Sequence, residues 1–243
     1  IGDGGNDVGM IQAADVGIGI EGKEGKQAAL AADYSILKFN YLNKLLLWHG
    51  RLSYKRSAMM AHFVIHRGLI LSFIQAIFSI VFYDLSISIY TGILILGYTT
   101  LYTFFPVFSI VFDEDIDVKR ALKYPPLYKT LQKGRELSLK NFFIWLWRSI
   151  YQAAIIMFFA LYLFDNSYYN IVTITFTALI LSELLNVTTT LHRITWQAVV
   201  SIASSLTLYI MTIIFLKRDI NASTITLQFL YKVTALTLLS WLP

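Results

Sequence analysis

Six apolar stretches dominate the chain after residue 61, and each is close to the roughly 20 residues that a helix needs to cross the hydrocarbon core of a bilayer. They run approximately over residues 62–83, 90–112, 142–164, 171–191, 198–216 and 224–242. The composition agrees with this pattern, because 56% of the residues are hydrophobic and only 14% are charged, against about 25% in soluble domains. We therefore predict an integral membrane protein in which residues 62–243 form a mostly α-helical, six-span bundle.

Basic residues are unevenly distributed between the two sides of this predicted bundle. The cationic residues of the connection 113–141 are Lys119, Arg120, Lys123, Lys129, Lys133, Arg135 and Lys140. The connections on the opposite side contain only Lys217 and Arg218. Because basic loops stay in the cytosol, we predict a cytosolic N-terminal segment, and an even number of spans returns the C-terminus to the same side. The formal net charge of +5 is thus assigned to loops, and no nucleic-acid partner is expected.

Residues 1–40 have the character of a water-soluble α/β domain. The sequence predicts a helix over residues 8–14, a strand over 16–20, a helical turn over 27–32 and a strand over 34–37. Short strands alternating with helices are typical of a sheet that binds ligands at the carboxyl ends of its strands. Forty residues are too few for such a domain, and the chain starts without methionine inside a glycine-rich motif. We therefore expect it to be the C-terminal part of a longer polypeptide.

Residues 41–61 are predicted to connect this segment to the membrane. Apolar side chains such as Leu45 and Trp48 are interspersed with cations such as Arg51 and Lys55. An amphipathic helix of this kind fits a stalk that continues into the first span as a lever, and it also fits a basic helix in the membrane interface. The two interpretations are compatible.

The stretch GDGGND places two carboxylates, Asp3 and Asp7, and the amide of Asn6 among glycines. The glycines let the backbone turn tightly and approach a ligand, while carboxylate oxygens suit Mg²⁺ and the amide suits a phosphoryl oxygen or a water. An ordinary polar turn that caps the helix after it would have a similar composition. The motif by itself leaves both interpretations open.

Longer runs around this motif carry a resemblance to a known family. GDGGNDVGMIQAADVGIGI, followed by EGKEGKQAALAADYSI, resembles the hinge motif and following segment of P-type ATPases, in the form found in the type IV branch, the phospholipid flippases. The resemblance covers essentially the whole chain, including the six C-terminal spans of a ten-span membrane domain. The runs RGLI, YPPLYK, KGRELS and FTALILSELL are similar to the Golgi and endosomal subgroup, which generally works without a partner subunit.

This resemblance implies an enzyme that uses ATP to move phospholipid toward the cytosolic leaflet through a phosphorylated aspartate. Residues 1–40 would be the C-terminal piece of its haloacid-dehalogenase-like phosphorylation domain. Asp3 and Asp7 would act at a Mg²⁺ site beside that aspartate, and Asn6 with Asp7 would help to hold the phosphoryl group. The DKTGT phosphorylation motif, the nucleotide-binding domain and the TGE loop of the family are absent from these residues. The chain alone is therefore expected to be inactive, and the whole protein is expected in Golgi or endosomal membranes.

Three residues of the first two predicted spans are candidates for the lipid path. Arg67 lies where flippases commonly have a lysine, and an ionisable side chain at that depth is costly unless it is paired or lines a wet path. Contact with a lipid phosphate or carbonyl and snorkelling to the cytosolic interface both fit this position. Pro106 frees a backbone carbonyl and should kink or unwind the second span next to the stretch that ends at Thr103.

Other polar residues of the spans suggest structural roles. Glu183, with Ser182 and Asn186 on adjacent faces, should point into the bundle and be hydrogen-bonded or protonated, and a structural polar clasp is favoured over a transport role. Arg148 and Lys232 lie near enough to span ends to snorkel. The remaining candidates are a four-residue His62 and His66 spacing without an evident third metal ligand, and a glycosylation sequon at Asn221 on the predicted non-cytosolic side.

Two alternatives to a lipid translocase remain. A cation-transporting P-type ATPase would need several oxygen ligands at mid-membrane, whereas Asp84 and Asp113 lie at the ends of the first two predicted spans. A non-catalytic membrane scaffold or regulatory remnant would keep the GDGGND motif without using it. Residues upstream of Ile1 would discriminate, because a pump requires the DKTGT and TGE motifs.

Overall fold

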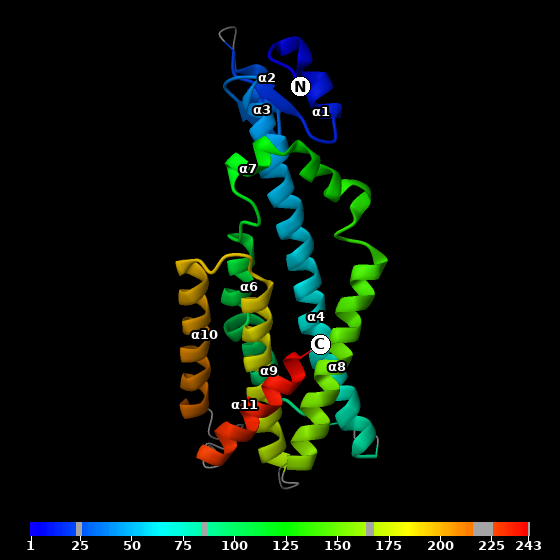
Figure 1. Ribbon diagram of the computed structural model, residues 1–243, viewed down its shortest axis with the longest axis vertical. Coiled ribbons are helices and arrows are strands. Elements are labelled where there is room, and N and C mark those ends of the chain that lie inside the picture. The colour runs from blue at the N-terminus through cyan, green and yellow to red at the C-terminus, as the bar shows by residue number, and fades with distance from the viewer. Residues whose placement is uncertain (23–25, 84–86, 164–167, 216–225, 243) are drawn as a thin grey trace. The chain divides into compact units, whose positions relative to one another are not determined.

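The computed structural model describes residues 1–22, 26–83, 87–163, 168–215 and 226–242. The chain divides into two units (Figure 1): one comprises Ile1–Tyr54 with Ile116–Lys133, and the other comprises Lys55–Asp115 with Gly134–Pro243. The segment predicted to be water-soluble falls in the first unit, and the six stretches predicted to span the membrane fall in the second.

A two-stranded parallel sheet organises the N-terminal segment. β1 (Ile18–Ile20) pairs with β2 (Tyr34–Ile36) in the register Ile18 to Tyr34, and an isolated parallel bridge joins Gly2 to Gly19. α1 (Val8–Ala13) precedes β1, and α2 (Gln27–Ala31) supplies the crossover that two consecutive parallel strands require. The four short elements predicted from the sequence are therefore present, in the predicted order.

Close packing of α2 on β1 holds this small sheet together. Ile11, Ile18 and Ala28 are almost completely buried, and they supply its apolar contacts. A Cβ atom on Gly19 would lie 2.6 Å from the carbonyl oxygen of Ala28, which is closer than real Cβ contacts come. The approach of the helix to the strand therefore requires glycine at position 19.

The rest of the first unit is built around the beginning of a long helix. α3 (Tyr41–Lys44) and a π-helical turn, η2 (Leu45–Gly50), lead into α4 (Arg51–Val81), and the three form one helical stretch. Against its beginning pack α7 (Val118–Lys123) and the 3₁₀ helix η4 (Pro125–Gly134).

Side chains of the long helix hold residues 116–133 in place. Arg51 is 4% exposed, and its Nη1 donates to the carbonyl of Leu127 at 2.7 Å and to the hydroxyl of Thr130 at 3.3 Å. Trp48 Nε1 donates to the carbonyl of Ile116 at 3.2 Å. Residues 116–133 are thus a packed part of the first unit, whereas their polar sequence also fits a solvated connector.

The second unit is a bundle of helices around α9 (Tyr168–Thr190) (Figure 1). Its other members are α4, α5 (Gly92–Gly97), the π-helical turn η3 (Tyr98–Tyr102), α6 (Phe104–Val111), α8 (Leu139–Leu163), α10 (Trp196–Phe215) and α11 (Leu227–Trp241). α9 packs against α6, α8 and α11, and 83% of its most apolar window is buried, against 17–50% for the other long helices. The polar residues of α9 between Thr173 and Asn186 are therefore interior residues.

Five helical stretches among the described residues are long and apolar enough to cross a membrane. They are Tyr41–Val81, Gly92–Val111, Leu139–Leu163, Asn170–Thr190 and Trp196–Phe215. They match the first five predicted spans, which confirms the prediction of a multi-pass membrane protein. The first begins at Tyr41 because the amphipathic segment before residue 62 continues the same helix.

The predicted sixth span corresponds to α11. Its described residues, Leu227–Trp241, are 15 of the roughly 20 that a crossing needs, and residues 216–225 before it lie outside the described ones, so the sixth crossing stays a prediction. Asn221 and its predicted sequon lie outside the described residues.

Candidate functional site

The GDGGND motif forms a tight corner next to the bridge between Gly2 and β1. Asp7 Oδ2 accepts hydrogen bonds from the backbone N–H groups of Asp3, at 3.0 Å, and of Gly4, at 3.4 Å. A 3₁₀ turn over Gly5–Asp7 runs directly into α1. A Cβ atom on Gly2 would lie 2.3 Å from the Asp7 Cβ, so the corner closes only with glycine there. The predicted residues Asp3 and Asp7 are therefore adjacent in space.

The corner offers oxygen atoms for part of a metal shell. The Asp3 carboxylate and the Asn6 side chain belong to exposed residues, and Asp7 Oδ1 makes no hydrogen bond with a described residue. Mg²⁺ prefers octahedral oxygen coordination and usually combines one or two carboxylates with phosphate oxygens and waters. Two carboxylates on a rigid turn fit that pattern, and no cluster of three or more His, Asp or Glu side chains suited to a metal occurs among the described residues.

Arg67, in the membrane half of α4, binds the irregular part of the second span. Its Nη1 donates to the hydroxyl of Thr103 at 2.7 Å and to the backbone carbonyl of Thr99 at 3.3 Å. The sequence left two interpretations of Arg67 open, contact with a lipid and snorkelling to the cytosolic interface. In the structure the side chain reaches across to a neighbouring span. The guanidinium is half-buried, so part of its donor surface is not covered by the chain.

The second span departs from α-helical geometry where Arg67 contacts it. The chain passes from α5 into the π-helical turn η3, and Thr103 (φ −112°, ψ −13°) separates η3 from α6. Pro106 follows three residues later and lacks the N–H that a regular helix would donate to residue 102. One turn earlier, the Thr103 hydroxyl donates to the carbonyl of Tyr98 at 2.5 Å. Arg67, Thr103 and the break before Pro106 thus form one feature.

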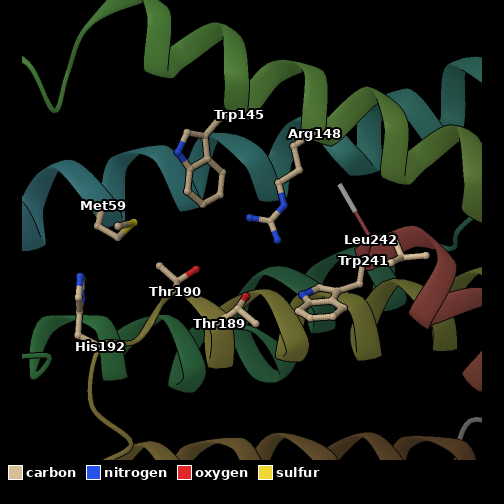
Figure 2. Close-up of a pocket in the computed structure, with 8 residues that line it drawn as sticks. All are labelled: Met59, Trp145, Arg148, Thr189, Thr190, His192, Trp241 and Leu242. Carbon is tan, nitrogen blue, oxygen red and sulfur yellow. The ribbon is translucent and has the colours of Figure 1, made fainter.

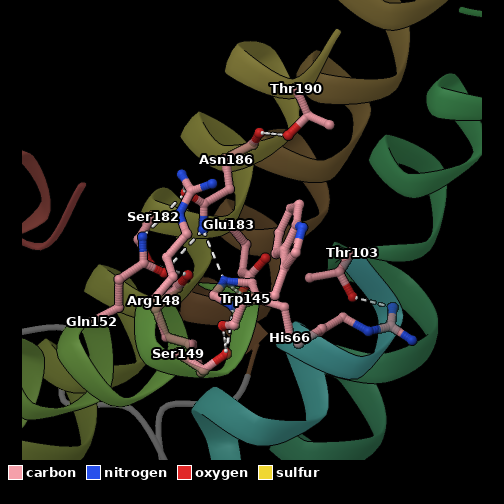
Figure 3. A network of polar contacts seen from close by, with 12 residues as sticks. His66, Thr103, Trp145, Arg148, Ser149, Gln152, Ser182, Glu183, Asn186 and Thr190 are labelled. Carbon is pink, nitrogen blue, oxygen red and sulfur yellow. Dashed lines mark hydrogen bonds and ion pairs between the residues drawn. The ribbon is translucent and has the colours of Figure 1, made fainter. Parts of the chain in front are cut away.

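A second group of polar side chains is buried between α4, α8 and α9 (Figure 3). Asn186 is at its centre: its Oδ1 accepts from Arg148 Nη2 at 2.7 Å and from Gln152 Nε2 at 3.2 Å. Its Nδ2 donates to Gln152 Oε1 at 3.1 Å and lies 3.2 Å from His66 Nε2. These residues are called the polar cluster below, together with Ser149, Glu183 and Tyr98.

Glu183 occupies the interior position predicted for it and is hydrogen-bonded there, as expected, but it makes fewer hydrogen bonds to neighbouring helices than Asn186. It is 1% exposed, accepts a hydrogen bond from the Tyr98 hydroxyl at 3.3 Å, and lies 3.7 Å from His66 Nε2. Ser182 donates to the carbonyl of Leu179 in its own helix. The residue that clasps the neighbouring helices is therefore Asn186.

Arg148 and His66 were not predicted to take part in this cluster. Arg148 was expected to snorkel, but its guanidinium turns inward to Asn186, where it also lies 5.5 Å from the ring centroid of Trp145. His66 is fully buried and pairs with Ser149, while His62 contacts the carbonyl of Ala58 in its own helix. The sequence feature that could have indicated these contacts is the presence of a polar residue in each of three apolar spans.

A cavity of about 530 Å³ lies beside the polar cluster (Figure 2). Trp145 and Arg148 of α8 line one side, and Thr189 and Thr190 at the end of α9 line another. The Arg148 guanidinium points into the space between these helices (Figure 2). One polar residue of the cluster is therefore also a wall of the cavity.

An acidic residue fixes the end of the second span, and sequence reasoning placed it only at a span end. The Asp113 carboxylate accepts hydrogen bonds from the backbone N–H groups of His192 and Arg193, at 3.1 and 3.2 Å, and pairs with His192 Nδ1 at 2.8 Å. Its backbone carbonyl accepts from Arg56 Nε at 2.6 Å. This clamp joins α4, the end of α6 and the connection between α9 and α10.

Comparison with known proteins gives consistent relatives over the whole length of the chain. "Probable phospholipid-transporting ATPase IIB" of Danio rerio is 55% identical over 100% of this chain and 22% of its own length. "Probable phospholipid-transporting ATPase tat-5" of Caenorhabditis elegans is 51% identical over 100% of this chain and 23% of its own length. "Phospholipid-transporting ATPase NEO1" of Saccharomyces cerevisiae is 56% identical over 66% of this chain and 14% of its own length.

The chain thus spans between about a fifth and a quarter of the curated relatives that it matches along its whole length. The family described as "Phospholipid-translocating P-type ATPase C-terminal" matches residues 29–242, which is most of the chain and all of its membrane helices. The chain belongs to the phospholipid-translocating P-type ATPase C-terminal family.

Proposed function

We propose that this chain is the C-terminal part of an ATP-driven phospholipid translocase that moves lipid toward the cytosolic leaflet through an aspartyl-phosphate cycle with Mg²⁺. The observation that carries the proposal is Arg67, a half-buried cation held against an irregular span inside a membrane bundle. An unwound helix and a guanidinium together provide polar partners for a headgroup at a depth where lipid offers none. The printed names of the relatives support the same activity.

In this proposal the GDGGND corner belongs to the phosphoryl-transfer site. Asp3 and Asp7 would hold Mg²⁺, which neutralises charge on the transferring phosphoryl group. Asn6 and Asp7 would position the phosphoryl oxygens, and Asp7 also fixes the turn through its bonds to the Asp3 and Gly4 amides. The phosphorylated aspartate and most of the ATP site would come from the remainder of a longer polypeptide. Residues 1–40 would then complete a haloacid-dehalogenase-like domain, and residues 41–61 a stalk.

Within the membrane, Arg67, Thr103 and the break before Pro106 would line the lipid path. A planar guanidinium with five donors can bind a phosphate or carbonyl oxygen while retaining its bond to Thr103. A cation-transporting pump is disfavoured by the same observation, because a fixed positive charge at the break repels a cation. In a non-catalytic scaffold, the contact between Arg67 and the second span would have no functional role.

The topology and location follow from the sequence rather than from the packing. We propose six crossings in residues 62–243, with the N-terminal segment, the connection 113–141 and the C-terminus in the cytosol. The resemblance to the Golgi and endosomal subgroup supports residence in those membranes and activity without a partner subunit.

Lipid transport by the full-length protein in proteoliposomes tests the proposal. Arg67→Gln removes the cation, and we expect ATP-driven transport of a fluorescent phospholipid to fall at least tenfold, whereas Arg67→Lys keeps a positive charge and should retain a measurable part. Arg135→Gln, at an exposed position between η4 and α8, is the matched control and should transport normally. Normal transport by Arg67→Gln would overturn the assigned path.

A further inference from the structure

Glu183 is a buried acid whose hydrogen bonding is incomplete. Its Oε1 accepts one hydrogen bond, from the Tyr98 hydroxyl at 3.3 Å, and its Oε2 has no hydrogen-bond partner among the described residues. An ionised carboxylate has room for about four hydrogen bonds and is strongly disfavoured in an apolar interior unless its charge is balanced at close range. The geometry around Glu183 therefore suits a protonated carboxyl group.

The cations near Glu183 are directed at other acceptors. Arg148 of α8 donates to Asn186, and Arg67 of α4 donates to Thr103 and Thr99. Lys232 of α11 donates to the carbonyl of Leu163 at the far end of α8. Among the titratable groups of the neighbouring helices that the structure describes, His66 and Tyr98 are the ones whose side chains approach the carboxyl oxygens.

The hydrogen bonds of the polar cluster are consistent with an uncharged His66. Asn186 Nδ2 is a donor, so the His66 Nε2 that it meets at 3.2 Å is an acceptor. Nδ1–H then donates to the Ser149 hydroxyl at 2.6 Å, and this hydroxyl donates to the carbonyl of Trp145 at 2.9 Å. An imidazolium would need Nε2 to donate, and the closest carboxylate oxygen for it is Glu183 Oε1 at 3.7 Å.

We propose that Glu183 and His66 form a proton-binding site in the membrane interior. In the arrangement described here the proton is on Glu183, and Asn186 occupies His66 Nε2. When the Asn186 amide turns away, the O–H bond of Glu183 breaks and an N–H bond forms at His66 Nε2, so a neutral pair becomes an ion pair with no change in net charge. The two groups that can bind the proton thus lie on different helices, Glu183 on α9 and His66 on α4.

The cavity beside the polar cluster offers space for water near this site. Its volume of about 530 Å³ would hold on the order of ten waters, each occupying roughly 30 Å³. Arg148 lines the cavity and bonds Asn186, and Trp145 lines it with its ring centroid 5.5 Å from that of His66. A side chain that lines the cavity is therefore in ring contact with His66, and another bonds the Asn186 amide that occupies His66 Nε2.

Tyr98 links the proton site to the break in the second span. Its hydroxyl lies 3.3 Å from both Glu183 Oε1 and the carbonyl of Arg67, and its own carbonyl accepts from the Thr103 hydroxyl. Ionisation of Glu183 would strengthen the bond from Tyr98 and pull on the first residue of η3. This link to lipid movement rests on the proposed function, whereas the proton site itself does not.

Infrared spectroscopy of the full-length protein tests the proton site without using transport. At neutral pH we expect a carbonyl band of a protonated carboxyl group that shifts when glutamate is labelled with ¹³C and that disappears in Glu183→Gln. Ser182→Ala, an adjacent buried residue whose hydroxyl bonds its own helix, should keep the band. The labelled wild-type protein needs no mutation, so misfolding of a variant cannot explain its result. A wild-type spectrum without a glutamic acid band, or a band retained in Glu183→Gln, would overturn the proposal.

A second measurement separates the proton site from the proposed function. Lipid-stimulated ATP hydrolysis of the wild type should change with pH, and Glu183→Gln should flatten this profile. If the infrared band behaves as expected but hydrolysis never responds to lipid, the proton site stands and the proposed function fails. A lipid-stimulated profile that is identical in wild type and Glu183→Gln would overturn the link through Tyr98.

Discussion

Asn186→Leu should destabilise the bundle more than any exposed polar substitution in it. Leucine has a similar volume but cannot replace the four hydrogen bonds that Asn186 makes with Arg148, Gln152 and His66. Asn186 is completely buried, so water cannot take its place beside Gln152 and His66, which are also fully buried. The substitution therefore removes the partner that Asn186 supplies to one cation, one amide and the Nε2 atom of one imidazole between α4, α8 and α9.

Two calibrations of the cost differ, and the membrane value is the appropriate one. In water-soluble proteins each orphaned partner costs about 1–3 kcal/mol, which for three partners would sum to about 3–9 kcal/mol. In a membrane the unfolded reference state also finds partners, and side-chain hydrogen bonds average about 0.6 kcal/mol. Four such bonds give about 2.4 kcal/mol of lost stability, because the helices remain in an apolar medium in both states.

Hydrogen exchange of the full-length protein in detergent micelles measures this loss locally. A change of about 2.4 kcal/mol corresponds to roughly 50-fold faster exchange in α8 and α9 when opening is at equilibrium. Thr207→Val is the control, because its hydroxyl is exposed and bonds only its own helix at Ser204 among described residues. An acceleration for Asn186→Leu no larger than that for Thr207→Val would refute the assignment of Asn186 as the clasp.

Two further predictions concern the clamp at Asp113 and the packing of the N-terminal sheet. Asp113→Ala leaves the backbone N–H groups of the His192 segment unpaired, so we expect a loss of about 1–3 kcal/mol there, seen as faster hydrogen exchange; Glu114→Ala, a more exposed neighbour, should change little. Gly19→Ala forces a Cβ into the backbone of α2, and should destabilise the N-terminal segment by about 1–3 kcal/mol in limited proteolysis, whereas Gly9→Ala meets open space and should not. Equal stability of the Gly19 and Gly9 variants would contradict the packing described for β1.

Apolar length made the membrane helices predictable, and glycine and β-branched patterns did the same for the small parallel sheet. A run of about 20 apolar residues has few alternatives in lipid, so five spans were found where expected. The continuation of the first helix back to Tyr41 shows that a change from apolar to amphipathic sequence need not interrupt a helix. The local sequence therefore predicted which elements are present better than it predicted where they begin and end.

Partners across the bundle were the part that local sequence could not supply. Glu183 and Asn186 were recognisable as interior residues because each is polar within an apolar run. That Arg148 turns inward, and that His66 faces Glu183, depends on which faces of three helices meet. The packing of η4 on Arg51 likewise depends on a contact between residues 76 positions apart.

Turnover of the phosphorylated intermediate in the full-length protein tests whether the GDGGND corner and the membrane spans belong to one lipid translocase. We expect Asp3→Asn to slow lipid-stimulated turnover of the phosphorylated intermediate by about 10²–10³-fold, the usual effect of losing one charge-stabilising group, and the exposed Asp15→Asn to leave it unchanged. Unchanged turnover in Asp3→Asn, or a phosphorylated intermediate that no phospholipid stimulates, would contradict the claim that this corner and these spans belong to a lipid translocase.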